Sequence, residues 1–184
     1  LLHDMAKPAT RVETPEGRIG FPGHDRLGAE MAEALMRRLR TSAKLRDFVA
    51  RGVRHHLPLG FMVHRTPLSL RQIDRYLRLT APSEVEIIVL SVADRLATRG
   101  PRTSESAISR HLVLAREVMD THFTLADRPP ERPLLAGDEV ARAVGREPGP
   151  WLVPVLDSLR EGQLVGVLRT RDQALRFVRE RAGM

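Results

Sequence analysis

Apolar residues recur along this chain at the three- and four-residue spacing of helices, and runs that alternate apolar and polar residues are absent. Two segments show the pattern most clearly, because four apolar side chains fall on one face of each. These are Leu27, Met31, Leu35 and Leu39 in the first, and Leu45, Phe48, Val49 and Val53 in the second. The period predicts an all-α protein, with helices near 24–39, 43–56, 69–79, 84–99, 104–126, 138–144, 151–164 and 171–182.

Three residue pairs match the S/T-x-x-E/Q capping box, in which two side chains satisfy free backbone amides at the start of a helix. The pairs are Ser69 with Gln72, Ser83 with Glu86, and Thr170 with Gln173. Each pair precedes a segment with a helical period, so each predicts a helix start and supports the all-α interpretation.

Prolines and glycines mark the breaks between these helices. Gly100-Pro101 separates two of the predicted helices, and three prolines stand within residues 128–133, where no helix can continue. We therefore predict a first domain over 1–127, a proline-rich linker over 128–133 and a small helical domain over 134–184.

The amino-acid composition limits which residues could form a catalytic or metal site. The 184 residues include no cysteine, which excludes disulfides, zinc knuckles and thiol nucleophiles, so any metal must be held by His, Asp and Glu.

The longest largely apolar stretch, residues 87–93, is far shorter than the roughly 18 residues of a transmembrane helix, so no membrane partner is expected. Net charge is +7, of which +6 falls in residues 1–133. This excess is compatible with a phosphate-bearing partner and equally with a solvated surface of mixed sign.

His3 and Asp4 stand together just before Lys7-Pro8, at the end of an apolar turn. An imidazole beside a carboxylate can ligate a divalent cation. His24 opens the next predicted helix on the same face as Leu27. A lone histidine at such a position is more often a capping or core residue than a ligand.

His56 falls near the centre of the apolar stripe of its helix, whereas His55 falls at the edge, so His56 is the better candidate to reach the core. Asp94 lies on the apolar face of its own helix. A buried carboxylate needs a partner, which here is either an arginine such as Arg95 or Arg99, a set of hydrogen bonds or a metal. Three histidine sites and two aspartates on facing helices together favour a metal cluster.

These residues occur in phrases that resemble the HD superfamily of metal-dependent phosphohydrolases. The closest resemblance is to the HD domain of bacterial tRNA nucleotidyltransferases (CCA-adding enzymes) and the related poly(A) polymerases. The matching phrases are Leu1-Leu2-His3-Asp4-Met5-Ala6-Lys7-Pro8-Ala9-Thr10-Arg11, Gly17-Arg18, Phe21-Pro22-Gly23-His24, Gly28-Ala29, Arg38-Leu39-Arg40-Thr41-Ser42, Val53-Arg54-His55-His56-Leu57 and Ala93-Asp94-Arg95. The segments 133–140, 148–150, 163–166 and 170–175 are similar to the C-terminal region of the same polymerases, so the resemblance covers essentially the whole chain.

The sequence departs from the family pattern in two ways. Ala6 replaces the usual glycine after the His-Asp pair. The chain also begins at Leu1, within a helix-like phrase, without the upstream histidine that is the superfamily's first metal ligand and without the Asp-x-Asp of a nucleotidyltransferase head. We therefore expect an N-terminally truncated protein that does not itself add nucleotides.

The resemblance implies an HD-domain helical bundle followed by a small helical, tRNA-binding-like domain. It implies that His3, Asp4 and Asp94 hold one divalent ion (Mg, Mn or Ni), and that His24 and His56 hold a second ion or bind phosphate. The ion would polarise a phosphoryl oxygen and make hydroxide available from bound water, with Asp4, His24 and His56 as the catalytic residues. Lys7 and Arg11 would neutralise substrate phosphate, or they are solvated loop charges.

The implied partners are tRNA or another RNA and a phosphate-ester or nucleotide substrate, in the cytoplasm. Trp151 either stacks on a base or packs with Leu152, Val155 and Leu156. Arginines near the C-terminus are candidate phosphate contacts, namely Arg169, Arg171, Arg176, Arg179 and Arg181. Two alternatives stay open: a stand-alone HD nucleotide phosphohydrolase and a non-catalytic RNA-binding scaffold.

Overall fold

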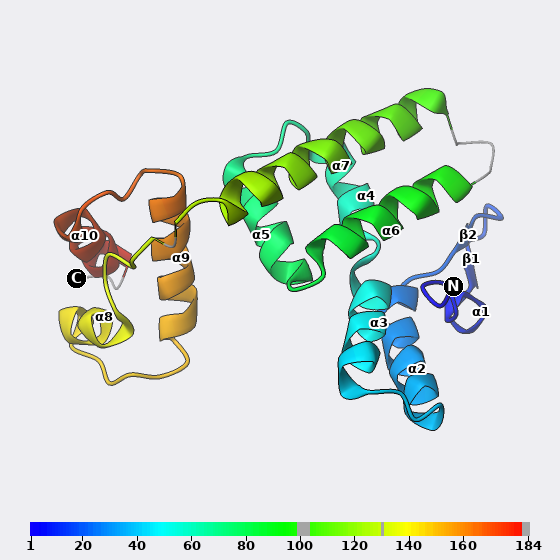
Figure 1. Cartoon of the computed structure of the whole chain (residues 1–184), viewed down its shortest axis with the longest axis horizontal. Coiled ribbons are helices and arrows are strands. Elements are labelled where there is room, and N and C mark those ends of the chain that lie inside the picture. Colours follow the sequence, from blue (N-terminus) through cyan, green and yellow to red (C-terminus); the bar gives the residue numbers. More distant parts are fainter. Residues whose placement is uncertain (99–103, 130, 182–184) are drawn as a thin grey trace. The chain divides into compact units, whose positions relative to one another are not determined.

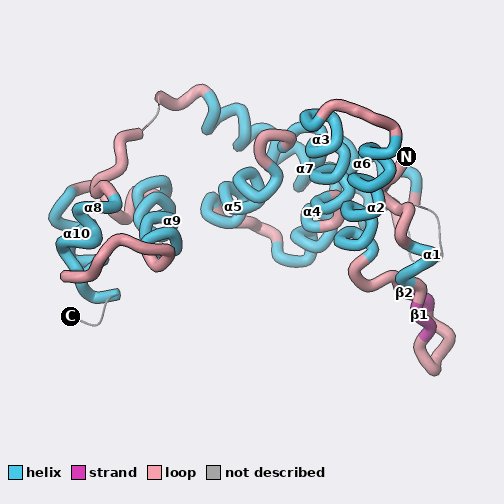
Figure 2. The backbone as a smooth tube through the Cα atoms, turned by 90° about the horizontal axis from the view of Figure 1, so that it is seen from below, coloured by secondary structure: helices cyan, strands magenta, loops and turns pink. Residues whose placement is uncertain are grey.

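A computed structural model of the chain describes residues 1–98, 104–129 and 131–181. The chain divides into two compact units, Leu1–Ala126 and Asp127–Met184. Helices make up most of both units, and the all-α prediction is confirmed (Figures 1 and 2). Arg99 and the predicted Gly100-Pro101 break lie outside the described residues, as do Pro130 of the predicted linker and residue 182 of the last predicted helix.

The first unit contains a short hairpin and most of the helices. Its elements are α1 (Lys7–Thr10), β1 (Val12–Glu13), β2 (Ile19–Gly20), α2 (His24–Arg38), α3 (Ala43–His55), α4 (Pro58–Met62), the 3-10 turn η1 (Val63–Arg65), α5 (Leu70–Thr80), α6 (Glu84–Ala97) and α7 (Glu105–Ala126). The antiparallel β1–β2 pair was not predicted, because each strand is only two residues long and leaves no alternating pattern in the sequence.

The buried stripe of α2, which packs against α3, lies beside the row of leucines that the apolar pattern marked. The buried residues of α2 are His24, Gly28, Ala32 and Met36. Leu27, Met31 and Leu35 flank this stripe half-buried, and Leu39, Leu45 and Phe48 are exposed. Small residues line the contact because α3 approaches closely, and a Cβ atom added at Gly28 would lie 3.0 Å from Cγ1 of Val53. The apolar pattern alone centred the buried stripe on the leucines, whereas the structure centres it on the neighbouring row that begins at His24.

Helices α4 to α7 enclose the main core of the first unit. Its buried residues include Leu59 from α4, Ile73 and Leu77 from α5, Ile88 from α6 and Leu114 from α7. Helix α4 is a single turn that begins at a proline, which has no amide hydrogen to lose at a helix start, and it is too short for a periodic signal.

Two of the three predicted capping boxes are confirmed. Ser69 and Gln72 exchange both hydrogen bonds at the start of α5, and Thr170 and Gln173 do the same before α10. Ser83 is the N-cap of α6, so the predicted helix start is confirmed, but the capping box predicted there is wrong, because the Ser83 side chain makes no capping hydrogen bond. Its backbone, at φ −125° and ψ 33°, departs from the extended conformation that directs a serine oxygen toward the third helical amide.

The second unit is a small three-helix arrangement of α8 (Gly137–Val144), α9 (Leu152–Leu164) and α10 (Arg171–Arg181). Its core is built from Leu135, Val140, Leu159, Leu168 and Val178. Trp151 packs half-buried against this core, and its indole nitrogen donates a hydrogen bond to the carbonyl of Glu147. The packing predicted for Trp151 is therefore observed. None of the described helices is long and apolar enough to cross a bilayer.

Candidate metal centre

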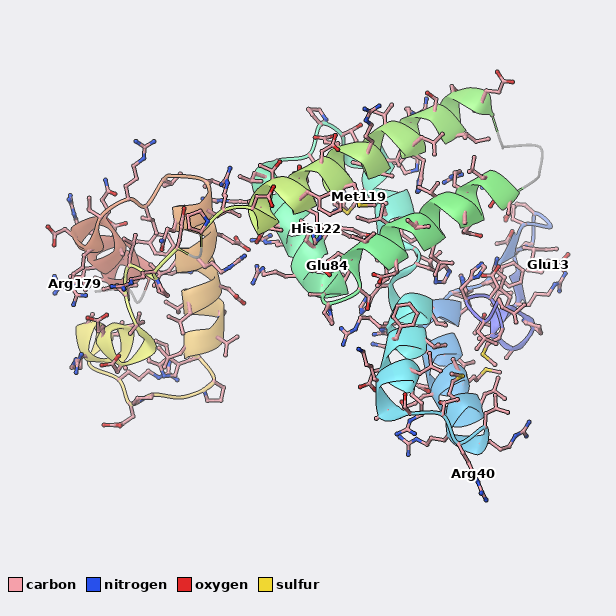
Figure 3. All side chains as sticks on the ribbon, in the orientation of Figure 1. Glu13, Arg40, Glu84, Met119, His122 and Arg179 are labelled. Atoms are coloured by element: carbon pink, nitrogen blue, oxygen red, sulfur yellow. The ribbon has the colours of Figure 1, made fainter. Side chains whose placement is uncertain are left out.

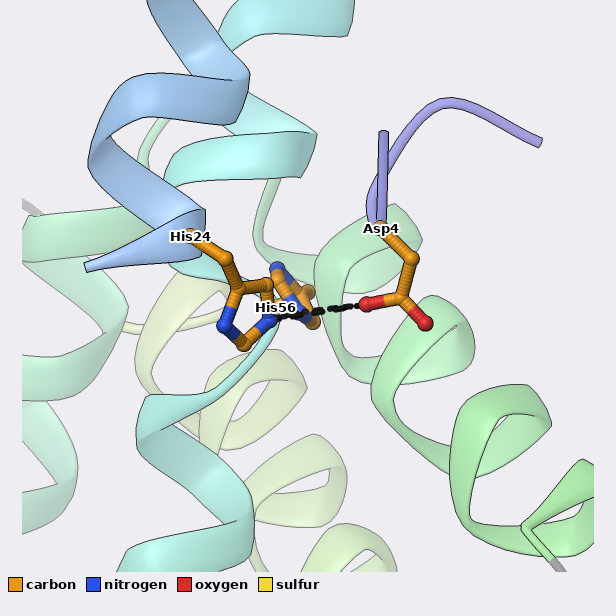
Figure 4. Close-up of side chains that lie close together, drawn as sticks. All are labelled: Asp4, His24 and His56. Carbon is orange, nitrogen blue, oxygen red and sulfur yellow. Dashed lines mark hydrogen bonds and ion pairs between the residues drawn. The ribbon is translucent and has the colours of Figure 1, made fainter. Parts of the chain in front are cut away.

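Five of the predicted site residues come together from the turn before α1, the start of α2, the end of α3 and the last turn of α6. His3 and Asp4 lie in the turn, His24 is the first residue of α2, His56 caps α3, and Asp94 lies on α6. Gly23 precedes His24 with φ +72°, a left-handed conformation that glycine adopts without strain, and this turns His24 inward. Figure 4 shows His24 and His56 facing Asp4.

Asp4, His24 and His56 form the first donor group. Oδ1 of Asp4 lies 3.4 Å from Nε2 of His24 and 3.9 Å from Nε2 of His56, and the two Nε2 atoms are 3.3 Å apart. Each histidine lies with Nδ1 2.7 Å from a backbone carbonyl, His24 from Phe21 and His56 from Val53. Because Nδ1 must carry the proton to donate to a carbonyl, both Nε2 atoms present lone pairs to each other and to the carboxylate. Such a set of acceptors fits a cation.

His3, Asp4 and Asp94 form the second donor group. Nε2 of His3 lies 3.3 Å from Oδ2 of Asp4 and 3.4 Å from Oδ1 of Asp94. Both ring nitrogens of His3 and Oδ1 of Asp4 are buried and have no hydrogen-bond partner within the described part of the chain. Unsatisfied buried polar atoms are costly, and a divalent ion would satisfy several of them together. Within each group the donor atoms lie within 4.8 Å of one another, so the residues fit a metal.

The protonation states suit metal binding. Burial raises the pKa of Asp4, but the hydrogen bond from Lys7 and the charges of His3, Lys7 and His24 outweigh it, so the pKa lies below its ordinary value. Burial lowers the pKa of His56, and the hydrogen bond to Val53 and the charge of Asp4 only partly oppose this. A carboxylate and an unprotonated imidazole are therefore present at neutral pH, and these are the forms that ligate metal.

Of the remaining predicted residues, Lys7 contacts the centre. Nζ of Lys7 is 2.6 Å from Oδ2 of Asp4. Arg11 pairs with Glu13 of β1 at 2.9 Å, and both side chains are exposed. His55 is half-buried and belongs to neither donor group, whereas His56 belongs to the first. Of the alternatives left open for Asp94, an arginine, hydrogen bonds or a metal, the described residues place Asp94 against His3 of the second donor group.

Sequence reasoning missed His111, a buried residue of α7. Its Nε2 lies 3.2 Å from Oγ of Ser91, which stands one turn before Asp94 on α6, and its Nδ1 has no hydrogen-bond partner among the described residues. His111 thus ties α7 to the helix that carries Asp94. Its position one turn before Leu114 and Ala115 on the buried face of α7 is the signal that could have found it.

Acidification should weaken the fold through His111. Burial and the charge of Arg95 lower its pKa, with Asp94 opposing. The unfolded chain, with an imidazole pKa near 6.5, then binds more protons than the folded chain below that pH. We expect the free energy of unfolding of the metal-free protein to fall between pH 7 and pH 5, and the His111→Gln variant to lose part of that slope, up to about 1.4 kcal/mol per pH unit. Urea titrations at each pH measure the free energy of unfolding.

The exposed His64 provides the control for this prediction. The His64→Gln variant should keep the wild-type dependence of stability on pH, and an equal slope in both variants would exclude His111 as the cause.

Comparison with known proteins assigns the class of this helical bundle. A family model described as the HD domain matches residues 1–99, more than half of the chain, and the chain therefore belongs to the HD domain family. Residues of both donor groups lie inside the match, whereas His111 lies beyond it.

Two curated relatives match almost the whole chain and confirm the resemblance to tRNA nucleotidyltransferases. A CC-adding tRNA nucleotidyltransferase of Thermus thermophilus is 35% identical over 180 residues, and an A-adding tRNA nucleotidyltransferase of Deinococcus radiodurans is 32% identical over 179 residues. Each alignment covers 97% of this chain but only 38% and 39% of the relatives, respectively. No solved structure matches the chain significantly.

Proposed function

We propose that this chain contributes a metal-dependent phosphohydrolase centre and an RNA-binding unit to a protein that processes tRNA 3′ ends. The observation that carries the hydrolase part is the pair of donor groups that share Asp4, in which buried atoms of His3 and Asp4 have no hydrogen-bond partner among the residues that the structure describes. The RNA part is supported by similarity to two tRNA nucleotidyltransferases over 97% of the chain, including the second unit.

In this proposal His3, Asp4 and Asp94 hold one divalent ion, and His24 and His56 complete a second site with Asp4. A bound divalent ion supplies positive charge that polarises a phosphoryl oxygen and lowers the pKa of water. The carbonyls of Phe21 and Val53 orient the imidazoles of His24 and His56, so that Nε2 of each faces Oδ1 of Asp4. Lys7 is the candidate for holding substrate phosphate, because its ammonium already lies at the centre. Arg11, bound to Glu13, would have to exchange partners to do so.

An activity screen tests the hydrolase part directly. The purified chain, stripped of metal and supplied with Mg²⁺, Mn²⁺ or Ni²⁺, should hydrolyse p-nitrophenyl phosphate or a 2′,3′-cyclic nucleotide, and EDTA should abolish the activity. A chain that binds RNA but hydrolyses neither substrate with any of the three ions would favour the non-catalytic scaffold. Hydrolysis without RNA binding would favour a stand-alone phosphohydrolase.

Binding of tRNA should depend strongly on salt and on exposed arginines of α10. Arg176 and Arg179 are exposed and form no ion pair among the described residues, whereas Arg171 pairs with Glu139 at 2.6 Å. We expect alanine at both Arg176 and Arg179 to weaken tRNA binding and to reduce the slope of log K against log salt by about 1 to 2. Arg171→Ala serves as the matched control and should change the slope less. Filter-binding titrations at several salt concentrations measure these slopes, and equal slopes in all variants would count against tRNA binding through the exposed arginines of α10.

A further inference from the structure

A buried histidine and a half-buried arginine lie at the same place beside α4. Helices α4, α6 and α7 pack against one another in the first unit (Figure 1). Arg95 comes from α6 and His111 from α7. A Cβ atom added at Gly60 of α4 would lie 3.8 Å from Cε1 of His111 and 4.0 Å from Nη2 of Arg95. The imidazole and the guanidinium therefore line one place, and partly exposed Gly60 has no side chain to fill it.

His111 has a ring nitrogen that the fold does not use. The residue is 1% exposed, and its Nε2 lies 3.2 Å from Oγ of Ser91. When the Ser91 hydroxyl donates to Nε2, the proton of the neutral ring is on Nδ1. Nδ1 is buried and has no hydrogen-bond partner in the described ranges. It is bonded to Cε1, the ring atom next to Gly60, so a costly unused donor lies at this place.

Arg95 adds a positive charge that no described residue neutralises. Its side chain is half-buried and forms no ion pair or hydrogen bond within the part of the chain that the structure describes. The preceding acid, Asp94, lies against His3 instead. Burial and the charge of Arg95 lower the pKa of His111, which keeps the imidazole neutral beside the guanidinium. A cation and a neutral N–H donor, both without an acceptor, fit an anion.

We propose that Arg95 and His111 form a phosphate-binding site next to Asp94 of the metal centre. This inference deepens the proposed hydrolase function and takes its substrate class, a phosphate ester, from it. The planar guanidinium binds two phosphate oxygens through parallel N–H groups, and Nδ1 of His111 donates to a third. Helix α6 thus supplies a ligand to the second donor group and, one residue later, the arginine that holds the substrate. Arg95 acts in addition to Lys7.

Calorimetric titration of the metal-free chain with inorganic phosphate tests the site without the metal. We expect the wild-type protein to bind phosphate and Arg95→Met to bind it about 10- to 100-fold more weakly. Arg95→Lys keeps the charge but loses the planar fork, so its affinity should fall between these two. His111→Gln keeps an amide that reaches Ser91 but has no group in the place of Nδ1, and it should bind phosphate about tenfold more weakly.

Arg110 provides the matched control, since it is exposed on α7 directly before His111. Arg110→Met removes the same charge and should leave phosphate affinity unchanged. Circular dichroism confirms that each variant is folded. With Ni²⁺ bound, Arg95→Met should raise KM for p-nitrophenyl phosphate more than it lowers kcat and should bind as much Ni²⁺ as the wild type, which a purely structural role of Arg95 would not produce.

The outcomes separate this inference from the proposed function. Equal phosphate affinity in the wild type and Arg95→Met, or no phosphate binding by the wild type, overturns the phosphate site. The metal centre still stands in that case if the proteins bind Ni²⁺. Phosphate binding that depends on Arg95, with no Ni²⁺ binding in any of the proteins, supports the phosphate site and overturns the metal centre.

Discussion

Replacing Asp4 by asparagine is expected to remove divalent-ion binding and hydrolysis together. Asp4 is the residue that both donor groups share, and its two oxygens face opposite sets of ligands. An amide presents one neutral oxygen where the carboxylate presents two charged ones. Loss of groups that merely orient ligands costs 10–100-fold in affinity, so loss of the shared ligand should cost at least about a hundredfold at each site. Metal content after dialysis and the rate of phosphate release measure the two effects.

Asp47, exposed on α3, provides the matched control for this change. Asp47→Asn removes the same charge from the same unit without touching the donor groups, so it should retain both ions and full activity. Hydrolysis by Asp4→Asn at the wild-type rate would show that the phosphohydrolase site lies elsewhere. Retained metal with lost activity would instead restrict the role of Asp4 to the reaction.

Removal of metal is expected to destabilise the first unit. A divalent ion bound to the folded centre would satisfy buried nitrogen and oxygen atoms that have no hydrogen-bond partner among the described residues, and it has no comparable site in the unfolded chain. At an ion concentration 100-fold above Kd, binding stabilises the folded state by about 2.7 kcal/mol. For a protein of this size that corresponds to a rise in Tm of roughly 5–10 °C. Thermal melts followed by circular dichroism, with EDTA and with added Ni²⁺, measure the difference.

Two optical signals can show which unit the metal stabilises in these thermal melts. The chain has one tryptophan, Trp151, and it lies in the core of the second unit, away from every donor residue in the sequence. Its fluorescence therefore reports on that unit while circular dichroism reports on both. The Asp4→Asn variant should show no metal-dependent shift. A shift of equal size in that variant would mean that the ion stabilises the protein through some other site.

Local sequence was sufficient to predict much of this protein. Helical period located the long helices to within a few residues, since each has enough turns for a stripe to emerge. Two capping boxes marked helix starts correctly, because the box is formed by residues three apart and depends little on the rest of the fold. The phrases around His3-Asp4, His24, His56 and Asp94 named the residues of the candidate centre and the family, because those phrases are short and strictly spaced.

Tertiary structure decided the features that depend on contacts between distant segments. The buried face of α2 follows from how closely Val53 approaches Gly28, which hydrophobicity cannot register. His111 lies beside Ser91 because α7 packs on α6. The arrangement of two donor groups on the two oxygens of Asp4, with Lys7 on one of them, arises only when four segments converge. Sequence thus determined which residues are candidates for the centre, whereas packing determined which of their atoms face each other, because distances between atoms on separate segments are set only by the packed fold.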